Sequence, residues 1–222
     1  MDIRAVRTLW LAMGVAVASI AVVPVASSSP ETSPRDPLAV TQARSIQLEV
    51  SSRYVRLGGH GLEVTEASST GVVESFTLLA ADLTKARIVP ADNGVYYAVC
   101  PVQATCPYPA RRFAHSAAAF LPRRIALELA VRTFQETSAD AVAVSLPTRR
   151  FVLFIIERSE FDQEDFSSQR AILARNPRLS TPVVRRLIDQ VTRPRVYAVM
   201  GLEPTSSGRD TVGAVPVWPE TG

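Results

Sequence analysis

Alternation of apolar and polar residues runs through the first half of the chain. Ile46, Leu48 and Val50 alternate with polar neighbours, which is the pattern of a half-buried β-strand. The alternation recurs on a smaller scale after a glycine-rich turn, and the apolar residues that follow again favour a strand. These patterns predict strands over residues 45–57, 61–67 and 71–83.

A fourth β-rich region surrounds a turn signal. Residues 86–89 and 95–99 are rich in β-branched and aromatic side chains, and the pair Asn93 and Gly94 lies between them. An Asn-Gly pair between two such runs favours the tight turn of a β-hairpin. We therefore expect residues 86–99 to form a hairpin.

The second half of the chain mixes helix and strand patterns. Residues 122–137 begin with Pro122, which suits the first turn of a helix, and their apolar residues share one helical face. Residues 141–146 and 151–156 are apolar runs on either side of a Pro-Thr turn, so they predict two adjacent strands. The run 151–156 has no polar face and should be a central strand that is covered on both sides.

Two further helices and a strand complete the predicted fold. Acidic residues favour the start of a helix over residues 162–176. The next helix begins at Ser180 or Thr181 as its cap, and residues 195–200 predict a last strand. The apolar stripe of that second helix consists of Val183, Val184, Leu187, Ile188 and Val191. This order of elements predicts an α+β fold, a mostly antiparallel sheet with helices packed on one face.

The N-terminal segment has the pattern of an export signal. A basic flank precedes residues 9–26, which carry no charge and end in small residues. The unbroken apolar core is short for a membrane span, and Pro24 is followed by small side chains that suit cleavage. Residues 8–26 are nevertheless long enough for a tilted anchor with its N-terminus inside. We predict that residues 1–26 are a signal peptide or a signal-anchor transmembrane helix, so that the protein is exported and either secreted or held in the cell membrane.

Composition divides the remainder of the chain. Residues 27–38 are rich in serine and proline and predict an extended linker. Residues 39–202 should form one extracytoplasmic domain. Residues 203–222 are rich in Pro, Gly, Ser and Thr and predict a flexible C-terminal tail, although Trp218 and two valines near it are apolar enough to dock on the domain.

Charge and motif content exclude several classes of function. The net charge is only +3, and the arginines are interspersed with acidic residues instead of forming a basic stripe, so we do not expect nucleic-acid binding. The chain has no nucleotide-binding glycine loop, no serine-nucleophile elbow and no zinc-protease motif. We therefore predict no catalytic residue, no cofactor and no metal ion. The four Arg-Arg pairs, which include Arg123 and Arg124, are expected on the solvated surface.

The two cysteines, Cys100 and Cys106, permit three interpretations together with His115. A zinc site would need closer cysteine spacing and a fourth ligand. A thiol nucleophile paired with His115 would have a second cysteine beside it that oxidises outside the cell. A disulfide uses both cysteines and suits an exported chain, so we predict a Cys100–Cys106 bond.

The residues around this loop suggest a recognition surface, because tyrosine and arginine are enriched in binding hot spots. The candidate residues are Tyr96, Tyr97, Tyr108, Arg111 and Arg112. We therefore expect a non-catalytic extracytoplasmic interaction or accessory module whose partner is a cell-envelope protein or ligand. The alternative is an extracytoplasmic enzyme that uses a Cys/His site around Cys100, Cys106 and His115.

Overall fold

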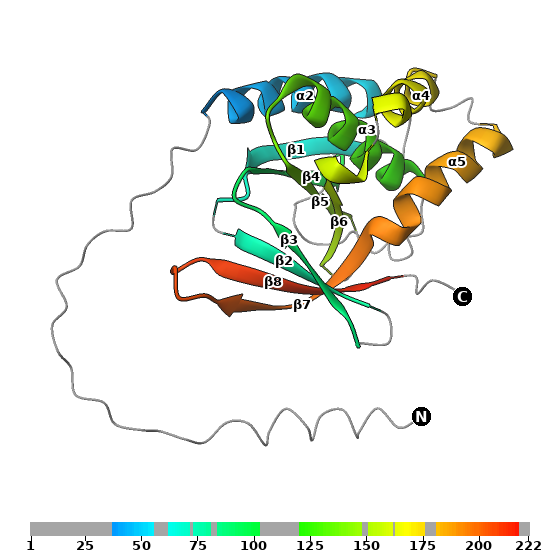
Figure 1. Ribbon diagram of the computed structural model, residues 1–222. Coiled ribbons are helices and arrows are strands. Elements are labelled where there is room, and N and C mark those ends of the chain that lie inside the picture. The colour runs from blue at the N-terminus through cyan, green and yellow to red at the C-terminus, as the bar shows by residue number, and fades with distance from the viewer. Residues whose placement is uncertain are drawn as a thin grey trace, which may run out of the picture. The chain divides into compact units, whose positions relative to one another are not determined.

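In this computed structural model, the described residues form one sheet of eight strands (Figure 1). The structure describes residues 37–55, 62–71, 73–80, 84–102, 120–147, 151–161, 163–175 and 181–217. The strands are β1 (Leu62–Ser69), β2 (Val73–Leu79), β3 (Ala86–Pro90), β4 (Gly94–Pro101), β5 (Ala141–Leu146), β6 (Val152–Glu157), β7 (Val196–Pro204) and β8 (Asp210–Pro216).

The strands lie in the order β1-β4-β5-β6-β7-β8-β2-β3. Neighbouring strands are antiparallel except for the pairs β4/β5 and β2/β8, which are parallel. The α-helices are α2 (Pro37–Val55), α3 (Phe120–Glu136), α4 (Gln163–Leu173) and α5 (Pro182–Thr192). The fold is therefore α+β with a mostly antiparallel sheet, as the sequence predicts.

Buried apolar residues form two clusters on the two faces of the sheet. The larger cluster, here called the helical core, contains residues of all four helices, among them Ile46, Leu129 and Ile188, packed on strand residues such as Phe154. The smaller cluster, here called the strand core, consists of strand residues and Ala91. Ile155 of β6 belongs to it, one position from Phe154. Strand β6 is thus buried on both faces, as its apolar sequence predicts.

The turn at Asn93 and Gly94 does not form the predicted hairpin. Strands β3 and β4 flank it, but they are not hydrogen-bonded neighbours. The backbone N–H of Thr70, between β1 and β2, donates to the carbonyl oxygen of Gly94 over 3.1 Å. A Cβ atom at position 94 would lie 2.6 Å from the Thr70 hydroxyl, so glycine permits the two connections to meet there.

Helix α2 replaces the strand predicted over residues 45–57. Its buried residues include Ala43, Ile46, Val50 and Tyr54, which lie three or four positions apart, whereas Leu48 is 68% exposed. Ile46 and Val50 are four positions apart. This spacing places them on one face of a strand, which has a period of two, and also on one face of a helix, where it is about one turn. Long-range packing on β1 and α3 decides between them.

The C-terminal segment is ordered where the sequence predicts a tail. Residues 203–217 complete β7 and form β8, which lies inside the sheet between β7 and β2. Val212 and Ala214 of β8 are buried in the strand core. Its composition is typical of a loop, but its pairing with β2, over 130 residues earlier in the chain, makes it a strand.

Helix α5 begins at the predicted cap. The Thr181 hydroxyl accepts a hydrogen bond from the Val184 backbone N–H over 3.3 Å, and Pro182 follows it. Of the predicted stripe, Val184 and Ile188 are buried, whereas Val183 and Leu187 are exposed. None of the helices in the described ranges is long and apolar enough to cross a membrane, and the predicted N-terminal signal or anchor lies outside those ranges.

Candidate binding pocket

Cys100 is buried near the C-terminal end of β4. Its Sγ atom lies 3.2 Å from the Thr65 hydroxyl of β1. Cys106 and His115 lie outside the described residues. The Cys100–Cys106 bond stays a prediction, and the described residues contain no group of side chains that could hold a metal ion.

The predicted tyrosine surface does not form on β4. Tyr97 is fully buried in the helical core, where its hydroxyl lies 2.7 Å from the Thr133 hydroxyl of α3. Tyr96 is half-buried against the strand core, on the opposite face of the sheet. Successive side chains of a strand point to opposite faces, so the two rings cannot share a surface. Tyr108, Arg111 and Arg112 lie outside the described residues.

The arginine pair of α3 is buried and not solvated as predicted. Arg123 and Arg124 are 1% and 0% exposed, and Glu128, one turn later, is 2% exposed. Charged residues are almost never buried this completely unless they are paired. Each of the three has partners on other helices.

Arg124 and Glu128 belong to a polar cluster that joins α2, α3 and α4. Glu128 pairs with the Arg53 guanidinium and accepts a hydrogen bond from the Tyr54 hydroxyl over 2.6 Å. The Nε atom of Arg124 donates to the same hydroxyl over 3.1 Å. Its Nη2 atom donates to the carbonyl oxygen of Leu173 over 3.1 Å and also to that of Arg175. Arg124 therefore supplies donors to the free carbonyl groups at the end of α4.

This cluster fixes the protonation of Tyr54. Burial raises the pKa of Tyr54 far above its ordinary value, and the negative charge of Glu128 raises it further. The phenol therefore stays neutral. Its O–H group donates a hydrogen bond to Glu128, and its oxygen accepts one from Arg124. Tyr54 thus separates a carboxylate and a guanidinium that are both buried.

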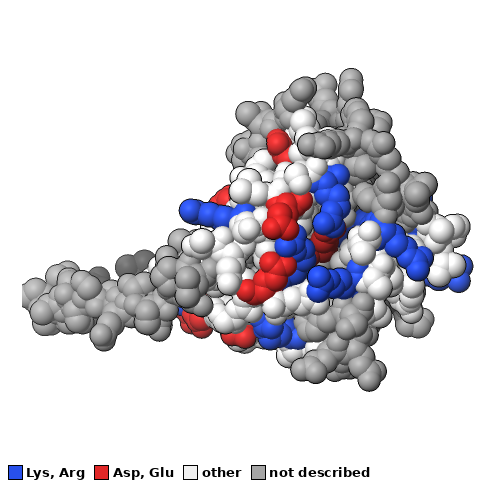
Figure 2. All heavy atoms as spheres, turned by 90° about the horizontal axis from the view of Figure 1, so that it is seen from above, with Lys and Arg blue, Asp and Glu red and all other residues white. Residues whose placement is uncertain are grey.

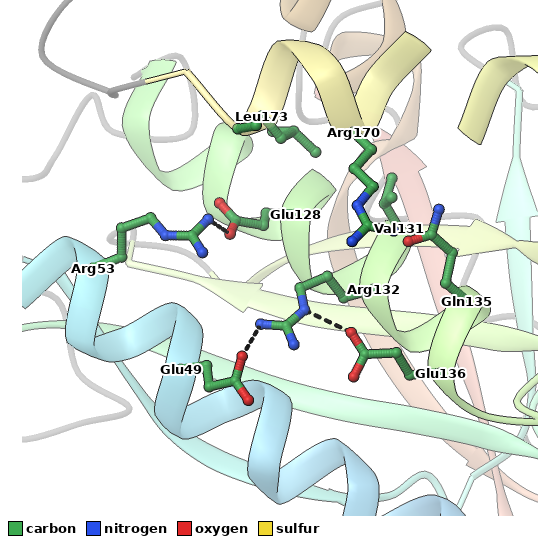
Figure 3. Close-up of a pocket in the computed structure, with 10 residues that line it drawn as sticks. Glu49, Arg53, Glu128, Val131, Arg132, Gln135, Glu136, Arg170 and Leu173 are labelled. Carbon is green, nitrogen blue, oxygen red and sulfur yellow. Dashed lines mark hydrogen bonds and ion pairs between the residues drawn. The ribbon is translucent and has the colours of Figure 1, made fainter. Parts of the chain in front are cut away.

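An open pocket of about 320 Å³ lies over this cluster, between α2, α3 and α4 (Figure 3). It is lined by Glu49, Arg53, Glu128, Val131, Arg132, Gln135, Glu136, Arg170, Leu173 and Ala174. Its volume is near the lower end of the roughly 300–1,000 Å³ that is typical of ligand sites. Seven of the ten lining residues are charged or polar.

Most of the charged side chains of the pocket are held in place. Arg132 makes ion pairs with Glu49 of α2 and Glu136 of α3, each over 2.8 Å. Arg170 differs from it. Figure 3 shows Arg170 reaching from α4 toward Val131 and Gln135 of α3. Its guanidinium has no ion-pair or hydrogen-bond partner among the residues that the structure describes.

The surface over α2, α3 and α4 is mixed in charge. Figure 2 shows this side from above, with acidic and basic side chains interleaved over its middle. The pocket lining contains three arginines and three glutamates. Together with the buried Arg124 behind them, these residues make four arginines and three glutamates, which gives a net charge of +1. The site therefore has only a small net positive charge.

Sequence reasoning missed this site for an identifiable reason. Glu128, Arg132 and Glu136 are four residues apart, which is a helix-surface spacing that the sequence displays. Their partners Glu49 and Arg53 are also four residues apart. In a strand, which the sequence predicts for this segment, that spacing does not bring two side chains together. Assigning a helix to residues 37–55 would have placed Glu49 and Arg53 on one face.

Comparisons with models of protein families, with curated protein sequences and with solved structures give no match for this chain.

Proposed function

We propose that this protein is an exported binding module of the cell envelope, and that it binds a carboxylate group of its ligand in the pocket between α2, α3 and α4. The unpaired guanidinium of Arg170 carries the proposal. A guanidinium presents several N–H donors in a plane and matches the two oxygens of a carboxylate. The amide of Gln135, on the same side of the pocket, supplies a further hydrogen-bonding group.

The ion pairs of the pocket support this proposal because they keep the site preorganised. Arg132 is held by Glu49 and Glu136, so its side chain needs little reordering when a ligand binds. Arg53 is held by Glu128. A site whose walls are already ordered loses less conformational entropy on binding, and more of the interaction energy remains as affinity.

Export is proposed from the sequence alone. The basic flank and the uncharged residues 9–26 support it, and the partner or ligand would then belong to the cell envelope. Cell fractionation followed by immunoblotting should place the chain outside the cytoplasm. Recovery in the cytosol would remove this part of the proposal and leave the pocket unaffected.

The proposed binding is tested with two peptides that differ in one group. N-acetyl-trialanine with a free carboxylate is titrated into the full-length protein and followed by NMR, and the same peptide with a C-terminal amide serves as the reference. We expect the free acid to bind more tightly. Arg170→Gln should reduce its affinity roughly 10–100-fold, since a charge-assisted hydrogen bond contributes about 1.5–3 kcal/mol.

The matched control is Arg44→Gln, which removes another exposed arginine from α2, outside the pocket. It should leave the affinity unchanged. The affinity for the acid should also fall as salt is added, because exposed charges are screened. Equal binding of acid and amide, or equal losses in the two variants, would show that Arg170 does not recognise a carboxylate.

A further inference from the structure

Helix α5 exposes apolar and basic side chains together on its outer side. Val183 is 68% exposed and Leu187 is 40% exposed, although both belong to the apolar stripe that the sequence shows. Arg186 and Arg193 are exposed as well and lie on the half of the helix that faces away from the buried Val184. Figure 1 shows α5 at the margin of the layer of helices. We call this surface the α5 face; it consists of Val183, Arg186, Leu187 and Arg193.

The α5 face carries an excess of positive charge. An open depression of about 570 Å³ runs along the helix and is lined by Arg185, Arg186 and Arg193. Asp189 is the one acidic residue among the described residues that line it. Asp189 is shared by two ion pairs, with Arg123 over 2.6 Å and with Arg193 over 3.2 Å. These four arginines and one aspartate have a net charge of +3, so the surface is complementary to anionic groups.

Two of these arginines are not neutralised by an acidic residue in the part of the chain that the structure describes. Arg186 is exposed and makes no ion pair, hydrogen bond or ring contact there. The guanidinium of Arg185 lies 5.4 Å from the centre of the Phe120 ring and pairs with no carboxylate among the same residues. A guanidinium can donate two parallel N–H bonds to a phosphate group, which makes arginine a suitable residue for phosphate recognition.

We propose that the α5 face docks on a membrane surface that contains anionic phospholipids. Val183 and Leu187 enter the boundary between headgroups and acyl chains, while Arg186 and Arg193 contact lipid phosphate groups. Basic residues beside exposed apolar residues are typical of a helix that lies in the membrane interface. A soluble acidic polymer or a free phosphate would satisfy the arginines but leave the two apolar side chains in water. An anionic lipid surface satisfies both.

The order of segments along the chain supports a membrane as the partner. Residues 9–26 are the proposed export signal or anchor, and only the ten residues 27–36 separate them from the start of α2 at Pro37. Ten residues span at most about 35 Å, so an uncleaved anchor keeps the domain within reach of the lipid surface. Docking is then an intramolecular step, for which a weak contact is sufficient. In this respect the inference rests on the proposed export.

Docking is tested by NMR on the full-length protein, labelled at valine and leucine methyl groups, in lipid nanodiscs that contain a nitroxide-labelled lipid. One set of nanodiscs contains phosphatidylcholine alone, and the other contains an equal amount of phosphatidylglycerol as well. In the anionic nanodiscs the nitroxide should broaden the methyl signals of Val183 and Leu187. It should not broaden those of Leu48, which is also 68% exposed but lies on α2. In neutral lipid the three residues should show the same weak broadening.

Two variants separate the charged and the apolar contributions, and each has a matched control on α2. Arg186→Gln should lower the ratio of docked to free domain about fivefold, since one arginine near an anionic surface contributes about 1 kcal/mol. Arg44→Gln removes another exposed arginine and should leave the ratio unchanged. Val183→Ser, measured at Leu187, should also lower the ratio, whereas Leu48→Ser should not. Added salt should weaken docking, because exposed charges are screened.

Several results would overturn the proposal. These are equal broadening of Val183 and Leu48 in the anionic nanodiscs, equal docking on neutral and anionic lipid, and unchanged docking of Arg186→Gln. Binding of polyglutamate or inorganic phosphate to the α5 face without lipid, with no loss in Val183→Ser, would identify a soluble anion as the partner. Recovery of the protein in the cytosol would contradict export alone, because the nanodisc experiment does not depend on where the cell places the chain.

Discussion

The two cores of this protein differ in whether they bury charged side chains. On the helical side of the sheet, α3 buries Arg123, Arg124 and Glu128 almost completely. In the strand core, on the other face, the described residues bury no charged side chain. Strand β6 contributes to both cores.

The difference follows from the hydrogen-bonding partners that each kind of element leaves available. The ends of helices have carbonyl groups without intrahelical partners, and Arg124 donates to those at the end of α4. Arg123 pairs with Asp189 of α5 over 2.6 Å and donates to the Thr192 hydroxyl over 2.9 Å. The two arginines thus tie α3 to helices on either side of it. In the middle of a sheet the backbone groups are used in the ladder, so a charge there would have no partner.

The largest expected effect is that of a charge placed in the strand core. Ile155→Asp puts a carboxylate at a position that is 0% exposed in β6. An unpaired buried charge costs several kcal/mol, comparable to the roughly 5–15 kcal/mol by which a domain is stable, so this variant should not fold. Circular dichroism and urea unfolding measure the outcome.

The control for this variant is Ile88→Asp, which makes the same change on strand β3 where the side chain is 66% exposed. Its free energy of unfolding should lie within about 0.5 kcal/mol of that of the wild type. A folded, monomeric Ile155→Asp protein would mean that the strand core tolerates charge, and the contrast between the two cores would not hold.

The next effect concerns the charges that are buried on the helical side. Glu128→Gln keeps the size of the side chain but removes the negative charge that Arg53 and Tyr54 share. We expect a loss of about 2–3 kcal/mol in the free energy of unfolding. The loss stays below that of a fully buried pair because Arg53 is 43% exposed and regains water.

Glu136→Gln provides the comparison on the same helix. Its carboxylate also pairs with an arginine, Arg132, but its side chain is 43% exposed. An exposed pair of this kind contributes about 0.3–0.5 kcal/mol. Chemical denaturation should therefore show a clearly larger loss in the free energy of unfolding for Glu128→Gln than for Glu136→Gln. Equal losses would show that burial does not increase the contribution of such a pair.

The sequence predicts those elements of the fold that depend on a local pattern of residues. The cap and start of α5, the helix over α3, and strands β5 and β6 follow from residues within one element. The burial of Arg124 does not, because its partner Tyr54 is 70 residues away in a segment that was predicted as a strand. Strand β8 escaped prediction for the same reason, since it depends on pairing with β2.

The pocket between α2, α3 and α4 and the pocket between α3, α4 and α5 could not be predicted from the sequence either. Each is formed where three helices meet, so its lining residues are scattered over more than 60 positions. The acidic residues at the start of α4 predict a helix over residues 162–176, which contains Gln169 and Arg170. They do not show that one is buried and the other faces a different pocket.

The last expected effect is a dependence of stability on alkaline pH that originates on the helical side. Burial raises the pKa of Tyr54 and of Tyr97 well above the ordinary value near 10. Above pH 10 the unfolded chain therefore loses protons from these phenols while the folded protein keeps them. The unfolded state then binds fewer protons than the native state, so the free energy of unfolding falls as the pH rises. Each phenol should contribute a slope of about 1.4 kcal/mol per pH unit.

Urea unfolding at pH 9, 10.5 and 11 measures this slope in the wild type and in Tyr97→Phe. The variant should lose about 1 kcal/mol at neutral pH, because the hydrogen bond between Tyr97 and Thr133 is absent. Between pH 9 and pH 11 its stability should then fall by about 1.4 kcal/mol less than that of the wild type. Parallel curves for the two proteins would mean that Tyr97 ionises equally in both states. The helical core would then be open to hydroxide at that position, and its tolerance of charge would come from water and not from the partners that α2, α4 and α5 provide.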